Sequence, residues 1–513
     1  MPAASPRTRT LALPAAAGVA AAAVGAGVGE LAAAVIAPAA SPFASIGSLL
    51  IDLAPPWAKD AAIALFGTGD KIALLVGIGV VLAALGAFAG VLEVRHPRWG
   101  RGLFAFAGVF GALAAATRAN ASMLAVLPAA LGAIAAMAAL TLLLRNVPAA
   151  GPDTTADGVD RRRFLAWAGG ATVLGVLAAI GASALTAGSR AVAAVRDALR
   201  LPPPVRRAAV PASAELGIEG LAPVITPNRD FYRIDTALNV PQVDPSEWRL
   251  RIHGMVDREV ELTWDDLLAL PLAESVTTLA CVSNEVGGDL IGTAVWLGYP
   301  IRELLAEARP SAGADMVLSR SIDGFTASTP LEALTDPDRE SVLAVGMNGE
   351  PLPLEHGFPV RMVVPGLYGY VSATKWVVDL EVTRFDRDRA YWSDRGWSER
   401  GPVKLSSRID VPRQGRSVDA GRVVVAGVAW HQHIGVAGVE VQVDDGEWEP
   451  ATLATAISAD TWVQWRFEWD ATAGGHTLRV RATSADGEVQ TADVAPVAPD
   501  GATGLHERRV DVR

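Results

Sequence analysis

Long apolar runs almost without charge fill most of the first 190 residues, whereas the rest of the chain mixes polar and apolar positions at short intervals. A helix needs roughly 20 apolar residues to cross a bilayer core about 30 Å thick. Five segments approach or meet this length: Leu11 to about Ala39, Ile72–Leu92, Leu103–Thr117, Met123–Leu144 and Phe164–Ala187. We therefore predict a transmembrane region of about five helices over residues 1–190.

Basic residues flank these segments unevenly. One set of flanks carries Arg7, Arg9, Arg95, Arg98, Arg101, Arg145, Arg161, Arg162 and Arg163, and the other carries only Lys59, Lys71 and Arg118. Because positive loops stay inside, we expect a multi-pass protein of the cell membrane with a cytoplasmic N-terminus. Five crossings then place everything after residue 188 outside the cytoplasm.

The run Arg161-Arg162-Arg163-Phe164-Leu165 also resembles a twin-arginine export signal, which is read by machinery that moves folded proteins. An ordinary basic stop-transfer flank is the alternative interpretation.

Beyond a Pro-rich linker at residues 191–214, the pattern changes twice. Residues 215–400 mix α and β: Trp248–Gly254, Val360–Val364 and Trp376–Val382 read as strands, and Thr263 is the predicted N-cap of a helix to Leu270. Residues 401–513 contain only strand-like segments separated by Gly-rich turns, among them Val423–Val428, Val439–Val443, Trp462–Trp469 and His476–Ala482. This spacing predicts an antiparallel β-sandwich of the Ig-like type.

Charge and cysteine content remove several function classes. A net charge of −11 argues against a nucleic-acid partner, since an acidic surface repels phosphate. The single cysteine excludes iron–sulfur clusters, zinc fingers and attached c-type haem, all of which need more thiols. None of the seven histidines lies inside the five apolar segments, so we also expect no b-type haem there.

Two stretches carry candidate chemistry. The first, Thr278-Leu-Ala-Cys-Val-Ser-Asn284, leads into a Gly-rich loop; a thiolate at Cys281 is a soft metal ligand, although a lone buried cysteine before a turn is the simpler interpretation. The second brings His356, Arg361 and Lys375 together among glycines. Cationic donors beside exposed backbone N–H groups suit a phosphate.

In order and spacing, these stretches and the Lys375-Trp376 pair resemble the sulfite oxidase family of molybdopterin enzymes, over residues 215–513. After the membrane helical bundle predicted from the apolar segments, the resemblance implies an α+β molybdopterin domain of the sulfite oxidase type and then an all-β Ig-like sandwich. It implies Mo-molybdopterin as the cofactor, with Cys281 as the metal ligand. It further implies a cofactor-binding set of Phe231, Arg233, Asn284, His356, Arg361, Ser372 and Lys375. The sandwich resembles the family's dimerisation domain, which allows a homodimer through it.

Three positions depart from the family pattern. Val286 stands where sulfite oxidases carry a second active-site Arg, Trp397 stands near the place of their catalytic Tyr, and Asp235 replaces a His. Fewer cationic donors make a weaker pocket for a dianion such as sulfite. The resemblance implies Cys281, Arg233 and Trp397 as the catalytic candidates, for two-electron oxygen-atom transfer on a small oxyanion or oxide. Electrons then need a separate carrier: a cytochrome, a quinone or a partner subunit.

Three alternatives remain open at this stage. The chain could be a reductase of sulfoxides or related oxides with the same fold, which the changes at Val286 and Trp397 favour. It could be a non-catalytic envelope protein with a degenerate cofactor domain. It could also be a channel or transporter, for which Glu30 is the one ionisable residue well inside a predicted span.

Overall fold

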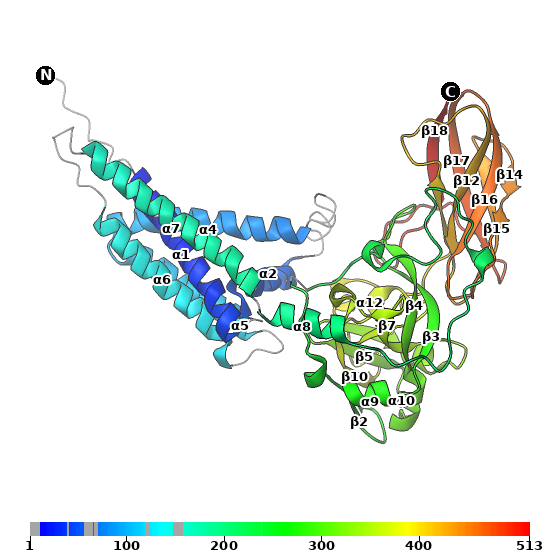
Figure 1. Cartoon of the computed structure of the whole chain (residues 1–513), viewed down its shortest axis with the longest axis horizontal. Helices are drawn as coiled ribbons and strands as arrows, with labels where there is room; N and C mark the ends of the chain where they lie inside the picture. The colour runs from blue at the N-terminus through cyan, green and yellow to red at the C-terminus, as the bar shows by residue number, and fades with distance from the viewer. Residues whose placement is uncertain are drawn as a thin grey trace. The chain divides into compact units, whose positions relative to one another are not determined.

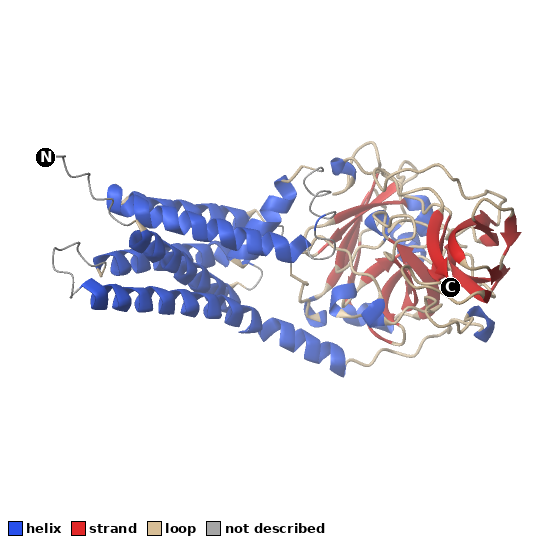
Figure 2. Cartoon of the chain, turned by 90° about the horizontal axis from the view of Figure 1, so that it is seen from above, coloured by secondary structure: helices blue, strands red, loops and turns tan. Residues whose placement is uncertain are grey.

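The computed structural model describes residues 11–37, 40–55, 65, 70–117, 123–146, 157–185, 187–237 and 239–513. The chain divides into two compact units, one of residues 1–192 with 237–240 and one of residues 193–236 with 241–513. Figure 1 colours the chain from its N-terminus to its C-terminus, and Figure 2 distinguishes the helices from the strands.

The first unit is built from helices (Figure 1). They are α1 Ala12–Ile36, α2 Pro42–Leu53, α4 Asp70–Arg95, α5 Trp99–Ala116, the 3-10 helix η3 Met123–Val126, α6 Leu127–Arg145 and α7 Asp157–Leu185. Five of the spans are long and apolar enough to cross a membrane, and they coincide with the five predicted segments. Helix α2 was not predicted, because its 12 residues fall short of a span. Arg7, Arg9, Lys59 and Arg118, which entered the orientation argument, lie outside the described residues.

Helix α1 packs against α4, α6 and α7 through glycines. A Cβ at Gly18 would lie 1.9 Å from the carbonyl oxygen of Gly86 on α4, and one at Gly27 would lie 2.5 Å from that of Gly175 on α7. Helices of apolar sequence gain no hydrophobic burial from each other in lipid, so close backbone approach at small residues holds them together. Ala17, on the same helix, is fully buried.

Glu30 has a structural partner within this unit. Its Oε1 accepts hydrogen bonds from the Ser41 hydroxyl and the Phe43 backbone N–H, both at 3.0 Å, at the start of α2. The carboxylate therefore ties two helices together, and this contact gives it a role that needs no transport path.

The second unit begins with two sheets, one with mixed and one with antiparallel strands. One sheet has the order β2-β1-β10-β5-β6, with β1 (Arg249–Gly254) parallel to β10 (Val377–Thr383) and the other pairs antiparallel. Its remaining strands are β2 Val260–Thr263, β5 Met316–Ser321 and β6 Thr326–Pro330. The predicted cap of α9 (Trp264–Ala269) is confirmed: the Thr263 hydroxyl and the Asp266 carboxylate bond each other's backbone N–H groups.

The second sheet contains the strand that ends just before Cys281. Its order is β3-β4-β7-β8, with β9 paired to β7. The strands are β3 Ala273–Ala280, β4 Ile291–Pro300, β7 Val342–Met347, β8 Glu350–Pro351 and β9 Arg361–Val363. Short helices α10 Ile301–Ala308, α11 Leu331–Thr335 and α12 Gly369–Ser372 connect the two sheets. Cys281 therefore follows directly on a buried strand.

The predicted linker is not free along its whole length. After α8 (Ala187–Ala198), the chain pairs with the edge of β3: Val205 N–H donates to the Leu272 carbonyl, and Glu274 N–H donates to the Arg206 carbonyl. Ala214, at the end of the linker, is 1% exposed. This part of the linker therefore lies against the sheet, because an open sheet edge offers hydrogen-bonding groups that the chain fills.

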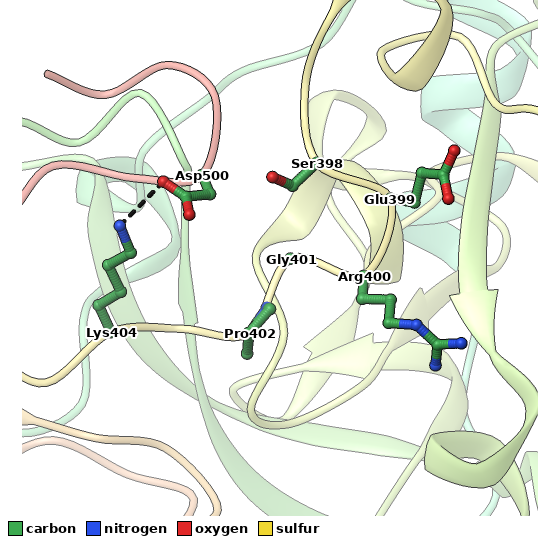
Figure 3. A pocket seen from close by; sticks show the side chains of 7 residues that line it. All are labelled: Ser398, Glu399, Arg400, Gly401, Pro402, Lys404 and Asp500. Atoms are coloured by element: carbon green, nitrogen blue, oxygen red, sulfur yellow. Dashed lines mark hydrogen bonds and ion pairs between the residues drawn. The ribbon is translucent and has the colours of Figure 1, made fainter.

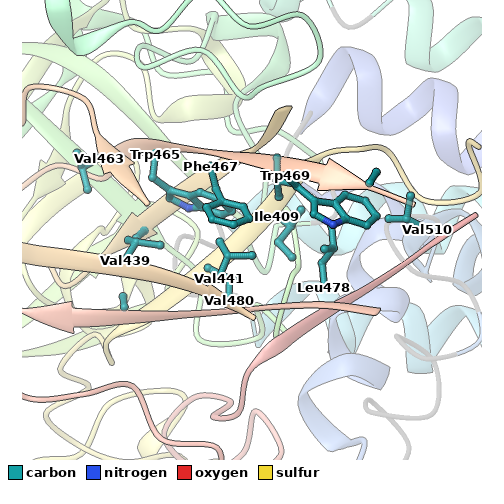
Figure 4. Packing of buried hydrophobic residues seen from close by; sticks show 14 of the residues in the cluster. Ile409, Val439, Val441, Val463, Trp465, Phe467, Trp469, Leu478, Val480 and Val510 are labelled. Carbon is teal, nitrogen blue, oxygen red and sulfur yellow. The ribbon is translucent and has the colours of Figure 1, made fainter. Parts of the chain in front are cut away.

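Two four-stranded antiparallel sheets form the C-terminal part. One has the order β11-β12-β16-β15 and the other β14-β13-β17-β18. The strands are β11 Ser406–Val411, β12 Gly421–Trp430, β13 Val436–Val443, β14 Trp448–Pro450, β15 Thr452–Leu453, β16 Val463–Ala471, β17 Gly474–Ser484 and β18 His506–Val512. Figure 4 shows Trp465 and Trp469 of one sheet against Val441 and Leu478 of the other, in a shared apolar core. The Ig-like assignment of this sandwich stays a prediction.

Candidate functional site

Cys281 lies buried at the start of a tight loop. Its side chain is 8% exposed, its N–H donates to the Leu290 carbonyl at 2.9 Å, and Asn284 Oδ1 accepts from Leu290 N–H at 2.9 Å. Burial raises the pKa of the Cys281 thiol, while hydrogen bonds from Ser283 and the charge of Lys375 lower it. The loop therefore fixes the position of the thiol, and Asn284 serves at least to close that loop.

The C-terminal sandwich holds the other side of this loop. The Arg408 guanidinium donates to the Gly288 carbonyl at 2.7 Å, and a Cβ at Gly287 would lie 2.4 Å from the His506 ring. Val286 Cγ2 lies 3.7 Å from the Cβ position of Gly504. The residue that stands in place of the family's second Arg thus packs against the sandwich.

His356 and Arg361 are buried together. His356 is 2% exposed; its Nε2 lies 3.2 Å from the Asn228 carbonyl, and its Nδ1 has no hydrogen-bond partner in the described part of the chain. Burial, helped by the charges of Lys375 and Arg361, lowers the pKa of His356 to about 3. The imidazole is therefore neutral at pH 7 and keeps one buried nitrogen open to a ligand.

Arg361 is a buried cation without a carboxylate. It is 3% exposed, its guanidinium lies 5.0 Å from the centre of the Trp296 ring, and it donates only to backbone carbonyls, including that of His356 at 3.2 Å. Burial lowers its pKa to about 10, which still leaves it charged at pH 7. Among the described residues no Asp or Glu pairs with it, and a buried charge of this kind costs free energy unless an anion compensates it.

Lys375 and Arg233 share one acid. Asp235 Oδ2 accepts from Lys375 Nζ and from Arg233 Nε, each at 3.1 Å, and Lys375 also donates to the Glu355 carbonyl at 2.9 Å. Burial lowers the pKa of Lys375 to about 8. The backbones of Arg361 and Lys375 form a β-bridge. Asp235 therefore pairs with two of the three cations, and Arg361 pairs with no carboxylate of the described residues, which leaves a positive site suited to an anionic group.

The other predicted residues lie around this cluster. Phe231 stacks on Tyr232 with ring centres 5.3 Å apart and meets the His356 ring edge-on at 5.6 Å. Ser372 is fully buried, with its hydroxyl 2.9 Å from the Tyr368 carbonyl inside its own turn. Trp397 contacts Tyr370 at 6.0 Å between ring centres and packs on the apolar cluster that contains Val282. Direct contact of these three with a cofactor or substrate stays a prediction.

Sequence reasoning missed Tyr232. Its hydroxyl has no hydrogen-bond partner among the described residues, and it lies 3.8 Å from the Cβ position of Gly369, where the Ala280 carbonyl oxygen lies at 3.7 Å. Burial raises the pKa of Tyr232, the charge of Cys281 raises it further, and that of Arg361 lowers it. The only signal in the sequence was its place between Phe231 and Arg233.

A separate pocket of about 300 Å³ lies beside the Trp397 segment (Figure 3). It is lined by Ser398, Glu399, Arg400, Gly401, Pro402, Lys404 and Asp500. Lys404 Nζ binds Asp500 Oδ1 at 2.9 Å across it, and the Ser398 carbonyl in its wall accepts from the Tyr370 hydroxyl at 2.6 Å. None of the Cys281 cluster lines this pocket, so the two are distinct.

Comparison with known proteins concerns the domain that contains this cluster. The family described as oxidoreductase molybdopterin binding domain matches residues 237–392. Mitochondrial sulfite oxidase of Homo sapiens is 31% identical over 321 residues, which are 53% of this chain and 58% of that protein. The uncharacterized oxidoreductase YuiH of Bacillus subtilis is 33% identical over 166 residues, which are 32% of this chain and 80% of that protein.

Among solved structures, the sulfane dehydrogenase SoxCD from Paracoccus pantotrophus matches 58% of this chain and 85% of that chain, at 23% identity and a TM-score of 0.49. The chain spans little more than half the length of the sulfite oxidases from mammals that it matches.

Proposed function

Because the chain belongs to the sulfite oxidase family of molybdopterin-dependent oxidoreductases, we propose that it exchanges an oxygen atom and two electrons with a small oxyanion or oxide, from a membrane anchor and outside the cytoplasm. The observation that carries this proposal is the positive cluster beside Cys281. Arg361 is buried without a carboxylate, and the buried Nδ1 of His356 has no partner in the described residues.

These residues fit an anionic pterin cofactor. Cys281 would supply the metal ligand, Arg361 and Lys375 would hold the phosphate, and the open nitrogen of His356 would take a polar group of the pterin. Phe231, Asn284 and Ser372 would shape the walls of the site. When bound, the molybdenum cofactor supplies two-electron redox chemistry and oxygen-atom transfer.

Side chains of this chain would bind the substrate and exclude water from the site. Arg233, whose side chain is 41% exposed, would attract an oxyanion to the entrance, and the unpartnered hydroxyl of Tyr232 would donate a hydrogen bond to a substrate oxygen. Trp397 and its aromatic neighbours Tyr370 and Trp392 would exclude water. Asp235 would hold Arg233 and Lys375 in place.

The test of the cofactor assignment is a metal analysis of the purified full chain. We expect one molybdenum per chain in the wild type. The Cys281→Ser variant replaces a soft thiolate with a hard hydroxyl and should lose activity even where the pterin is retained. Full activity of Cys281→Ser would overturn the assignment.

The substrate test compares sulfite, assayed with an artificial electron acceptor, and a sulfoxide, assayed with an artificial donor. Val286 offers no charge where sulfite oxidases carry Arg, and one charge-assisted hydrogen bond contributes roughly 1.5–3 kcal/mol, or about one to two decades of affinity. We therefore expect poor sulfite turnover, and reduction of a sulfoxide or related oxide is the second candidate function. Sulfite turnover as efficient as that of the sulfite oxidases would contradict the expected poor turnover and exclude this second candidate function.

The anchor and the partners are part of the same proposal. Five apolar helices could span a membrane, and the basic flanks favour an external second unit.

The apolar segments contain no histidine for a b-type haem, so a cytochrome, a quinone or a partner subunit would carry the electrons. A homodimer would form through the C-terminal sandwich. A b-type absorption spectrum from the purified, reduced chain would contradict the need for a separate carrier.

A further inference from the structure

One group of potential metal ligands lies far in sequence from Cys281, at one end of the C-terminal sandwich. His431 follows the last residue of β12, and Asp486 and Glu488 lie in the turn after β17. One ring nitrogen of His431 and one carboxylate oxygen of each acid all lie within 4.8 Å of one another.

The backbone fixes the two loops against each other. Ala485 N–H donates to the Gly435 carbonyl at 3.0 Å, and Gly435 N–H donates to the His431 carbonyl at 2.7 Å. Ser484 N–H and the Glu488 carbonyl close the turn at 2.8 Å. The strand register of the sandwich therefore brings the three side chains together. Their proximity does not depend on a random approach of two mobile loops.

His431 is a buried ring with one unpaired nitrogen. Its side chain is 6% exposed, and its Nδ1 is buried without a hydrogen-bond partner in the described residues. Most buried polar atoms have a hydrogen-bond partner, and the unpaired Nδ1 of His431 is therefore open to a ligand. Burial lowers the pKa of His431, while the charges of Glu488 and Asp486 raise it.

The two acids add an unbalanced charge. Within residues 239–513, neither Asp486 nor Glu488 forms an ion pair with a lysine or arginine. Two carboxylates this close repel each other, and a divalent cation between them would relieve the repulsion. Both acids are exposed, so their side chains can move the short distance that coordination requires.

We propose that His431, Asp486 and Glu488 form a second metal site, which binds a divalent transition-metal ion such as Zn²⁺. One imidazole and two carboxylates are a ligand set that suits Zn²⁺ or Mn²⁺, whereas Mg²⁺ prefers oxygen ligands alone. Water completes the coordination at the exposed side.

The site also reaches the molybdopterin domain through its own loop. Gln432 and His433 follow His431 directly, and His433 Nδ1 lies 3.0 Å from Asp460, while its Nε2 lies 3.4 Å from Asp336 of the molybdopterin domain. A metal on His431 would therefore stiffen a loop that joins the two domains, and binding should raise the unfolding temperature of the second unit.

The experiment measures Zn²⁺, Mn²⁺ and Mg²⁺ binding to the purified full chain by equilibrium dialysis with elemental analysis, and follows the unfolding midpoint. We expect one Zn²⁺ per chain that the double variant Asp486→Asn/Glu488→Gln does not bind. We expect at least a tenfold weaker affinity for His431→Gln, and a Zn²⁺-dependent rise of roughly 5 °C in the wild-type unfolding midpoint that is absent in the double variant.

His476→Gln is the matched control. This histidine lies in the same sandwich, but its Nδ1 already binds Asp444 at 2.8 Å and its Nε2 lies 2.9 Å from the Thr472 carbonyl. It should bind Zn²⁺ as the wild type does. The same stoichiometry and affinity in Glu488→Gln as in the wild type would overturn the site, and that exposed substitution does not endanger folding. Binding of Mg²⁺ as tight as that of Zn²⁺ would overturn the choice of a transition metal.

Discussion

Tyr232 is the residue whose placement most changes the view of the substrate site. Its hydroxyl lies near the Cys281 loop without a partner in the described residues, although the sequence comparison pointed to Trp397. Tyr232→Phe removes only this hydroxyl. We expect kcat/KM to fall about 10- to 100-fold, the loss of one hydrogen bond to a charged group, with molybdenum content unchanged.

Tyr299→Phe is the control for that loss. The Tyr299 side chain lies near Glu303 and Glu307, and the pKa of its hydroxyl responds to those acids and not to Cys281. Its activity should stay at the wild-type level. Equal losses in both variants would show that the effect is one of general stability, and no loss in Tyr232→Phe would remove this hydroxyl from the reaction.

Two buried histidines should make the second unit sensitive to acid. Burial lowers the pKa of His356 to about 3 and that of His506 to about 4, and His506 Nδ1 accepts from the Ile409 N–H at 2.9 Å. The unfolded chain binds these protons near pH 6.5, whereas the folded chain does not. Their contribution to stability is therefore present above pH 6.5 and lost as the pH falls toward 4.

The size of this loss can be measured by denaturant unfolding. From pH 7 to pH 5 each histidine should remove about 2 kcal/mol from the free energy of unfolding. His506→Gln should flatten the pH dependence by about that amount, while exposed His96→Gln should leave it unchanged. A wild-type stability that is constant from pH 7 to pH 5 would contradict the neutral, buried state of both rings.

At the scale of elements, the glycines of α1 are specific packing positions. Gly18 meets Gly86 and Gly90 on α4 at distances that no side chain could accept, whereas Gly77 on α4 has nothing within 4 Å of its Cβ position. Gly18→Leu should therefore separate α1 from α4 and lower the unfolding temperature of the detergent-solubilised chain by several degrees. Gly77→Leu should not. Equal behaviour of the two variants in thermal unfolding would refute this packing.

The helices and strands that the sequence predicted are those determined by residues close together in the chain. The N-cap at Thr263, the five apolar spans and the strand that follows Trp248 each depend on neighbours within a few residues, and all are found. The central place of α1 and the pairing of the Val205–Arg206 segment with the end of β3 depend on partners more than 60 residues away, and no periodicity indicates them.

The features of the candidate site also fall into two groups, those indicated by neighbours in the sequence and those that depend on tertiary packing. Cys281, His356, Arg361 and Lys375 could be proposed because glycines and apolar runs frame them in sequence. Their burial, the shared carboxylate of Asp235 and the absence of an acid beside Arg361 in the described residues come only from tertiary packing. The free hydroxyl of Tyr232 belongs to this second class as well.

At the scale of the whole molecule, the prediction concerns the membrane topology of the chain. A reporter enzyme fused after Arg513 should be active only outside the cytoplasm, because the basic flanks keep their loops inside. Replacing Arg161 and Arg162 with Lys should block export if the twin-arginine route is used, and unchanged export would favour a stop-transfer flank. A cytoplasmic reporter signal would overturn the external placement of the second unit.

The contacts of the sandwich with the Cys281 loop have a consequence for synthesis. Thr278 N–H donates to the Asp460 carbonyl, Trp462 N–H donates to the Thr278 hydroxyl, and His506 fills the space at Gly287. About 220 residues separate Cys281 from His506, which a ribosome takes roughly 10–45 s to translate. Over that interval the nascent loop lacks its supports and the thiol is open to oxidation or to the wrong metal. A chaperone that shields the loop, or a cytoplasm that keeps it reduced, would have to cover this delay before cofactor loading.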